Sequence, residues 1–325
     1  MKLLWRTDVH LSERNPRSRT DNWREAIMGK LKQVGEIADR IGAKAVIDGG
    51  DFFDIKSPSR NSHDLIREVA ELHKDYPCPV YANVGNHDCV YGDYTYLPQQ
   101  PLGVLFATGV FKRLYDEHDV TFEDAGVKVR VAGIPYHGTK YDLERFKSIK
   151  KGDEDHLVVA AHVLASRKGG SMFENEDIIK YDDLLEMNPD VDVWLFGHWH
   201  KDQGVYEKKG RYIVNVGSLS RGALVQDDMD RKPCAIELRF GGACPTDMPI
   251  EVVRHDLDIP EAMEIFDVQG RERQEMRESV MEDFVTNLKE SLVSEGGDNT
   301  LESVVAKTDV PDTVRERALS YLELS

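Results

Sequence analysis

The sequence is poor in cysteine and lacks several features that mark whole classes of protein. Its 325 residues hold only four cysteines, without a CxxC pair, so we expect reduced thiols in a cytosolic chain rather than a disulfide framework. No run of 18 apolar residues occurs, and no transmembrane helix is expected. Charged residues follow Met1 before any signal-peptide core could form, so no secretory leader is expected either.

The sequence also lacks nucleotide-binding motifs and an excess of positive charge. Neither GxxxxGK[ST] nor GxGxxG occurs, so the sequence does not support an intrinsic nucleotide-binding loop. Positive charge is in deficit, because 42 Lys and Arg stand against 59 Asp and Glu and give a formal charge of -17. That balance argues against a protein that coats nucleic acid by bulk charge. With 40% hydrophobic and 31% charged residues, the chain is typical of a globular protein with a large core.

The first part of the chain alternates strand and helix patterns, which predicts parallel strands joined by crossover helices. Thr20 or Asp21 is the expected N-cap of the first helix, and Gly42 is expected to close it. Apolar periodicity places strands at residues 2–7, 43–47 and 79–84, and helices at residues 22–41 and 65–72.

The later part is richer in strands, so a second sheet is expected. Its predicted elements are a hairpin turning at residues 124–126 and strands at 157–161, 191–196, 212–216 and 235–238. After Pro260 the pattern becomes helical, first at residues 276–292 and again at 309–324. We therefore predict a domain over residues 1–258 and a helical C-terminal segment over residues 259–325.

Polar and imidazole side chains follow five of the predicted strands. The segments are Asp8-Val9-His10, Gly50-Asp51-Phe52-Phe53-Asp54, Gly85-Asn86-His87-Asp88, His162 and Gly197-His198-Trp199-His200. Loops at the carboxyl ends of parallel strands converge on one crevice. Two carboxylates, one amide oxygen and four imidazoles there would suffice for two divalent metals, with His87 left over for acid chemistry. Any one segment could be an accident of the surface or the core, but all five in this order are improbable by chance.

In order and content these motifs resemble the calcineurin-like metallophosphoesterase superfamily, with D-x-H, G-D-x-x-D, G-N-H-D, H and G-H-x-H spread over about residues 1–255. The resemblance implies an α/β (α+β) fold, a four-layer αββα sandwich with a short helical C-terminal appendage. It implies two metal sites that share Asp51 as a bridge. The implied ligands are Asp8, His10, Asp51 and His200 for one ion, and Asp51, Asn86, His162 and His198 for the other.

The same resemblance implies the chemistry. Mixed nitrogen and oxygen ligands suit Mn²⁺, which we favour, and also Mg²⁺, Fe or Zn²⁺. Two such ions activate a hydroxide and neutralise phosphoryl charge during in-line attack. His87 is implied to contact the phosphate or protonate the leaving oxygen, with Asp88 fixing its ring. Asp54 is expected to be structural rather than a ligand.

Finer details resemble SbcD-type DNA double-strand-break repair nucleases and the compact phage recombination nucleases of that group. They are the aromatic pair in Asp51-Phe52-Phe53-Asp54, the Asp8-Val9-His10-Leu11 segment and the run from Asn215 to Arg221. The resemblance implies a metal-dependent exonuclease, with endonuclease activity left open, that works on DNA in recombination and repair. It also implies an SMC-like ATPase partner of the SbcC type, a homodimer, and the cytoplasm of a bacterium or of a phage-infected host.

Two alternatives stay open. Only about 65 residues follow Pro260, so we expect the family's DNA-capping domain to be reduced or absent. A small-molecule or cyclic-nucleotide phosphodiesterase or phosphatase is therefore the first alternative, and a recombination scaffold with structural metals is the second. The C-terminal helices either dock on the ATPase or pack back on the core.

Substrate contacts are predicted from charge near the motifs. Arg14, Arg17 and Arg19 follow the first motif, and guanidinium groups suit phosphate oxygens. His137 follows a predicted strand and is a further candidate. The alternative for each is an ordinary solvated loop.

The charge deficit is uneven along the chain. Residues 256–325 hold 18 acidic and 7 basic residues, a net of -11, which leaves -6 for the rest of the chain. Two divalent ions would bring that remainder to about -2. The acidic balance therefore does not exclude a nuclease, and it predicts weak DNA binding without a partner.

Overall fold

The computed structural model describes residues 1–169, 175–241 and 250–268, together with residues 270, 273, 276 and 315. The chain divides into two compact units, Met1–Phe266 and Asp267–Ser325. The helices predicted at residues 276–292 and 309–324 belong to the second unit and, apart from single positions, lie outside the described residues. Within the described part, no helix is long and apolar enough to cross a membrane.

The first sheet joins the N-terminal strands to two late strands, in the order β14-β13-β1-β2-β3-β4. Strands β1 to β4 run parallel, as the strand–helix alternation predicts, and β13 and β14 are antiparallel additions. The bounds are β1 (Lys2–Arg6), β2 (Val46–Asp48), β3 (Val80–Ala82), β4 (Phe111–Arg113), β13 (Cys234–Phe240) and β14 (Ile250–Asp256).

Helix α1 (Trp23–Ile41) forms where the apolar spacing predicts it and buries one face. Its N-cap is Asn22, whose side chain accepts a hydrogen bond from a first-turn N–H. The predicted caps Thr20 and Asp21 are wrong, because the helix begins later and the Asp21 carboxylate is engaged in an ion pair. Gly42 ends the helix as predicted, in the left-handed conformation with φ of 65°.

The second sheet has the order β11-β12-β10-β7-β6-β5. Its four central strands run parallel, and the edge strands β5 and β11 each form a hairpin with a neighbour. The bounds are β5 (Val120–Asp124), β6 (Val127–Ile134), β7 (His156–His162), β10 (Val193–Gly197), β11 (Asp202–Lys208) and β12 (Arg211–Val216), and a two-stranded sheet adds β8 (Ala165–Ser166) and β9 (Ile179–Lys180).

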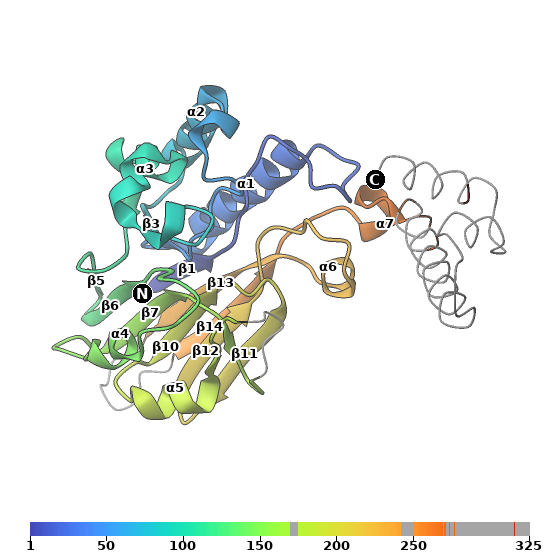
Figure 1. Ribbon diagram of the computed structural model, residues 1–325. Coiled ribbons are helices and arrows are strands. Elements are labelled where there is room, and N and C mark those ends of the chain that lie inside the picture. Colours follow the sequence, from blue (N-terminus) through green and yellow to red (C-terminus); the bar gives the residue numbers. More distant parts are fainter. Residues whose placement is uncertain are drawn as a thin grey trace, which may run out of the picture. The chain divides into compact units, whose positions relative to one another are not determined.

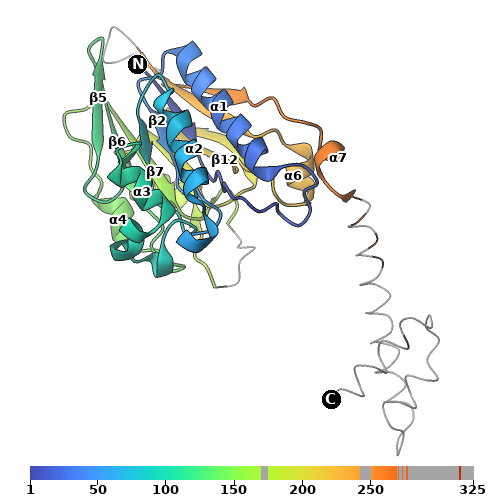
Figure 2. The ribbon, with the colours of Figure 1, turned by 90° about the horizontal axis from the view of Figure 1, so that it is seen from above.

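Helices cover the outer faces of both sheets, as Figure 1 shows, and Figure 2 looks onto the layer that holds α1 and α2. The remaining bounds are α2 (His63–Lys74), α3 (Pro101–Ala107), α4 (Leu143–Ser148), α5 (Tyr181–Met187), α6 (Gln226–Asp230) and α7 (Ala262–Ile265), with 3-10 turns η1 (Pro58–Arg60), η2 (Val90–Gly92) and η3 (Tyr94–Gln99).

Three buried apolar clusters separate the layers. One holds α1, α2 and α3 on the first sheet through residues such as Ile27 and Val69. A second lies between the sheets and includes Trp5 and Leu195. The third packs α4 and α5 on the second sheet around Phe146. This arrangement confirms the predicted αββα sandwich.

The first unit ends later than the sequence predicts. The division falls after Phe266 rather than after residue 258. Helix α7 packs on this unit, because Ile265 is buried and its carbonyl accepts from the Thr20 N–H at 3.0 Å. Phe266 also forms a bridge with Arg19. These contacts are long-range, so the local change of pattern at Pro260 did not reveal them.

Candidate metal centre

Both sheets contribute to the candidate site, because their parallel strands end at the same edge. The predicted segments follow β1 (Asp8, His10), β2 (Asp51), β3 (Asn86, His87) and β10 (His198, His200), and His162 is the last residue of β7. Two contacts join the sheets here. His162 Nδ1 lies 2.8 Å from the Gly49 carbonyl oxygen, and the His198 N–H donates to Asp8 at 3.0 Å. The five segments therefore meet in one place.

The first group of donor atoms comes from Asp8, His10, Asp51 and His200, which lie within 4.8 Å of one another. The Nε2 atoms of His10 and His200 are 2.9 Å apart. Nε2 of His10 also lies 3.7 Å from Asp51 Oδ2, and Nε2 of His200 lies 3.5 Å from Asp8 Oδ1. Two imidazole nitrogens and two carboxylates thus face a common point.

The second group holds Asp51, His162 and His198. His162 Nε2 lies 3.3 Å from Asp51 Oδ2 and 3.3 Å from Asn86 Oδ1, so the amide oxygen joins the group. Asp51 belongs to both groups, which is the position that a bridging carboxylate requires.

The main chain at four of these residues adopts a conformation that side chains rarely allow. The φ angles are 53° at Asp8, 48° at His10, 54° at Asp51 and 87° at His198. Each such residue costs on the order of 1–3 kcal/mol and persists only where its surroundings impose it. At Gly85 a side chain would collide with the Asp51 carboxylate. Four of the eight described non-glycine residues with positive φ are therefore candidate ligands.

The electrostatics of the cluster favour positive charge. Burial alone would lower the pKa of His10, but hydrogen bonds to Asp54 and Asp8 and the charge of Asp51 raise it to about 10. His162 behaves in the same way beside Asp51, with a pKa raised to about 9. Burial works to raise the pKa of Asp8, but the histidines hold it well below its usual value. Buried carboxylates with convergent imidazoles fit divalent cations.

His87 adjoins the centre without joining either donor group. Its side chain is 40% exposed, and its Nδ1 lies 2.6 Å from the main-chain carbonyl oxygen of Asp54. The prediction that Asp88 fixes the ring is wrong. The Asp88 carboxylate instead accepts main-chain N–H groups of Asp51 (2.7 Å) and Gly85 (3.0 Å), with further contacts to the two phenylalanines after Asp51. Asp88 thus shapes the turn that carries Asp51.

Asp54 contacts two histidines of the candidate metal centre. Its Oδ1 lies 3.5 Å from His10 Nδ1, while its carbonyl oxygen holds His87. One residue therefore contacts a candidate ligand with its side chain and a candidate catalytic residue with its backbone. Ligand atoms of Asp54, His10 and His87 also lie within 4.8 Å of one another, so Asp54 could itself be a metal ligand, and the structural role expected from the sequence stays a prediction.

Sequence reasoning missed Glu176. Its Oε1 lies 2.9 Å from His198 Nε2 and accepts from the Tyr141 hydroxyl at 2.8 Å. Hydrogen bonds to His198 and Tyr141, against the effect of burial, lower the pKa of this carboxyl group. No motif flags Glu176, since it lies in a connecting segment between β8 and β9.

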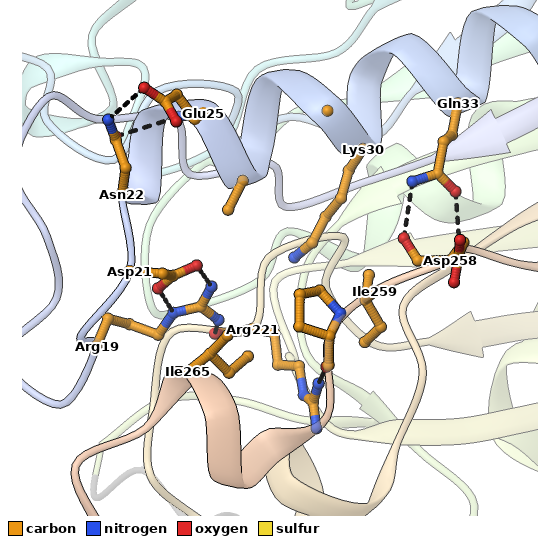
Figure 3. A pocket seen from close by; sticks show the side chains of 13 residues that line it. Arg19, Asp21, Asn22, Glu25, Lys30, Gln33, Arg221, Asp258, Ile259 and Ile265 are labelled. Carbon is orange, nitrogen blue, oxygen red and sulfur yellow. Dashed lines mark hydrogen bonds and ion pairs between the residues drawn. The ribbon is translucent and has the colours of Figure 1, made fainter.

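The predicted substrate contacts Arg14, Arg17 and Arg19 differ in their exposure to solvent. Arg14 and Arg17 are exposed. Arg19 is buried, and Figure 3 shows its guanidinium turned to the Asp21 carboxylate, with a further bond to the Arg221 carbonyl oxygen. The structure therefore does not support Arg19 as a substrate contact, because the residue is buried and three of its five N–H groups are engaged with these partners.

His137 is likewise committed to its own loop. Nδ1 lies 2.9 Å from the Pro135 carbonyl oxygen, and Nε2 accepts from the Asp142 N–H at 3.2 Å. Because both ring nitrogens are engaged, the structure does not support His137 as a substrate contact.

Comparison with known proteins places this geometry in a family. The model of the calcineurin-like phosphoesterase family matches residues 1–202. The chain therefore belongs to the calcineurin-like phosphoesterase family, whose members are hydrolases that bind divalent metals.

Two curated relatives are described as DNA double-strand break repair protein Mre11. The one from Archaeoglobus fulgidus is 25% identical over 232 residues, which are 68% of this chain and 50% of the relative. The one from Sulfolobus acidocaldarius is 24% identical over 297 residues, 89% of this chain and 72% of the relative. The chain thus spans half the length of the Archaeoglobus protein. Among solved structures, the NAD nucleotidase of Haemophilus influenzae has a TM-score of 0.45 and 13% identity, with 98% of this chain and 60% of that chain covered.

Proposed function

We propose that this chain is a metal-dependent DNA nuclease, an exonuclease with endonuclease activity left open, that acts in recombination and repair. The observation that carries the proposal is the meeting of two donor groups that share Asp51 beside an exposed His87. The similarity to two Mre11 proteins supports DNA over other phosphoesters.

Each candidate ligand has an assigned role in this proposal. Asp8, His10, Asp51 and His200 hold one divalent ion, most suitably Mn²⁺, and Asp51, Asn86, His162 and His198 hold the other. Bound metals would lower the pKa of water and offset charge on the phosphoryl oxygens.

His87 supplies the proton chemistry. A carbonyl oxygen only accepts, so the Asp54 carbonyl keeps a hydrogen on His87 Nδ1. Nε2 is then the nitrogen that gains and gives the proton. Placed beside both donor groups, a protonated His87 would donate to the leaving oxygen as the phosphodiester breaks. Asp88 contributes indirectly, by holding the turn of Asp51.

A nuclease with a net charge of -17 requires a partner to bind DNA. We propose an SMC-like ATPase of the SbcC type as the partner, with residues 267–325 as the docking segment, and a homodimer as the assembly. The acidic charge of this segment suits a basic partner surface and disfavours DNA.

A small-molecule or cyclic-nucleotide phosphodiesterase or phosphatase is the second candidate. The net charge of -17 favours it, since such a substrate needs no extended cationic surface.

A nuclease assay with varied metal separates the candidates. Linear DNA should be degraded with Mn²⁺, survive with EDTA, and survive with His87→Ala or Asp51→Asn. If DNA survives with every metal while bis(p-nitrophenyl) phosphate is hydrolysed quickly, the small-molecule function is correct and the nuclease proposal is wrong. If His87→Ala retains full hydrolysis, the assigned chemistry is wrong.

A further inference from the structure

Two pockets meet at His87 and differ in character. A cavity of about 620 Å³ is lined by Asp51, His198 and Trp199, and its wall continues to Val225. A second cavity, of about 460 Å³, is lined by Lys56 and Arg60. Both are also lined by Asn86 and His87, so these two residues form the ridge between the pockets.

The larger pocket has an apolar wall next to candidate ligands. Val225 is 49% exposed although it is apolar, and the indole of Trp199 is only partly buried. Asp227 and Asp228 also line this pocket, and Arg231 pairs with both, at 2.6 Å from Asp228 and 3.3 Å from Asp227. Lys201 in the same lining supplies a second positive charge, so the two carboxylates are balanced. The wall therefore suits a flat, uncharged group such as a nucleobase, which stacks on aromatic and apolar surface.

The smaller pocket has the opposite chemistry. Lys56 Nζ donates to the Asn86 and Cys89 carbonyl oxygens at 3.0 and 3.3 Å, which leaves one of its three N–H groups. Arg60 is exposed and forms no ion pair with any described residue. Asp54 also lines this pocket, so two cations stand against one carboxylate, and the remaining positive charge on this side of His87 suits a phosphate group.

We propose that the larger pocket binds the nucleobase on one side of the scissile phosphate and that Lys56 and Arg60 bind the next phosphate on the other side. This inference rests on the proposed nuclease function, and it adds that the enzyme recognises a nucleotide together with a neighbouring phosphate. A monoester or a small diester fills at most one of the two pockets.

Scanning an abasic nucleotide along a single-stranded oligonucleotide tests the base pocket in the wild-type protein with Mn²⁺. Cleavage of one phosphodiester should slow about ten-fold when the abasic nucleotide lies on one particular side of it. Val225→Ser, which removes apolar surface without adding charge, should slow cleavage of the normal oligonucleotide more than cleavage of the abasic one. The matched control is Val205→Ser, because Val205 is also apolar and 44% exposed but lies on β11 outside both pockets.

The phosphate pocket is tested with Arg60→Glu. Oligonucleotide cleavage should fall about ten-fold or more through KM, since an attractive contact becomes repulsive, and it should fall more than turnover of bis(p-nitrophenyl) phosphate, which has no neighbouring phosphate. Arg113→Glu, at another exposed arginine, is the control.

The outcomes keep the two proposals apart. Oligonucleotides cleaved at equal rates whatever the abasic position, or cleaved normally by Arg60→Glu, would overturn the two-pocket inference and leave the nuclease function standing. Failure of the wild type to cleave any oligonucleotide while it hydrolyses the small diester would overturn the proposed function itself.

Discussion

At the scale of single residues, His87 and Asp88 have different roles although they are adjacent in the sequence. His87 faces solvent beside the donor groups, whereas Asp88 is buried and satisfies main-chain N–H groups of the Asp51 turn. Asp88→Asn would turn an amide N–H toward those donors. We expect it to lower the free energy of unfolding by about 1–3 kcal/mol, measured by chemical denaturation.

His87→Ala should leave the free energy of unfolding close to that of the wild type and lower kcat about 10²–10⁴-fold. Steady-state kinetics on bis(p-nitrophenyl) phosphate measures this. Should Asp88→Asn keep full stability and change only the pH profile of kcat, Asp88 would orient the ring after all.

Asp54 carries a second prediction at this scale. Its carboxylate lies 3.5 Å from His10 Nδ1, and a group that orients a metal-binding histidine commonly contributes 10–100-fold in metal affinity. We expect Asp54→Ala to weaken Mn²⁺ binding by about that factor, measured by calorimetry. Asp64→Ala is the control, because Asp64 is similarly exposed but pairs with Arg24 on the helical surface. Equal affinities of both variants would contradict this role.

At the scale of elements, a buried cluster of the polar side chains Arg6, Asp48 and His73 links α2 to the first sheet. Arg6 of β1 donates to Asp48 of β2 at 2.7 Å, and its Nη2 lies 3.0 Å from His73 Nε2 on α2. His73 Nδ1 lies 2.7 Å from the Val69 carbonyl oxygen. Burial, and then the charge of Arg6, hold the pKa of His73 well below its usual 6.5.

This arrangement predicts a pH dependence of stability. In the folded protein His73 stays neutral, while in the unfolded chain it takes up a proton below about pH 6.5. The unfolded state then binds more protons, so stability falls as the pH drops below that value, by about 1 kcal/mol per pH unit from this residue. His73→Gln, whose amide oxygen can still accept from Arg6, should show a shallower fall between pH 6.5 and 5.5 in denaturation experiments. Parallel curves for the two proteins would contradict the prediction.

At the scale of the whole molecule, charge is divided between the two units. Residues 267–325 hold 14 acidic and 7 basic residues, a net of -7, and every candidate ligand lies in Met1–Phe266. Removing residues 267–325 should therefore raise affinity for DNA several-fold at low salt and leave hydrolysis of bis(p-nitrophenyl) phosphate unchanged. Fluorescence anisotropy over a salt series measures the first effect. Weaker DNA binding by the shortened chain would show instead that this segment holds DNA.

Much of the fold and the candidate site could be predicted because the signals are local. Apolar periodicity located α1 and the parallel strands, and hard ligands after each strand identified the residues that the structure gathers around Asp51. Such signals depend only on neighbouring residues and on the rule that parallel strands end at one edge. The sequence determined these features by itself.

Only the tertiary structure decided which partners meet over long distances. It showed that the site lies where two sheets end together, with His162 against Gly49, rather than in the crevice of one sheet. It also showed that Arg19 pairs with Asp21, that Asp88 accepts a hydrogen bond from the main chain of Asp51, and that Glu176 contacts His198. These contacts depend on the burial and orientation of side chains far apart in the chain, and no local pattern encodes them.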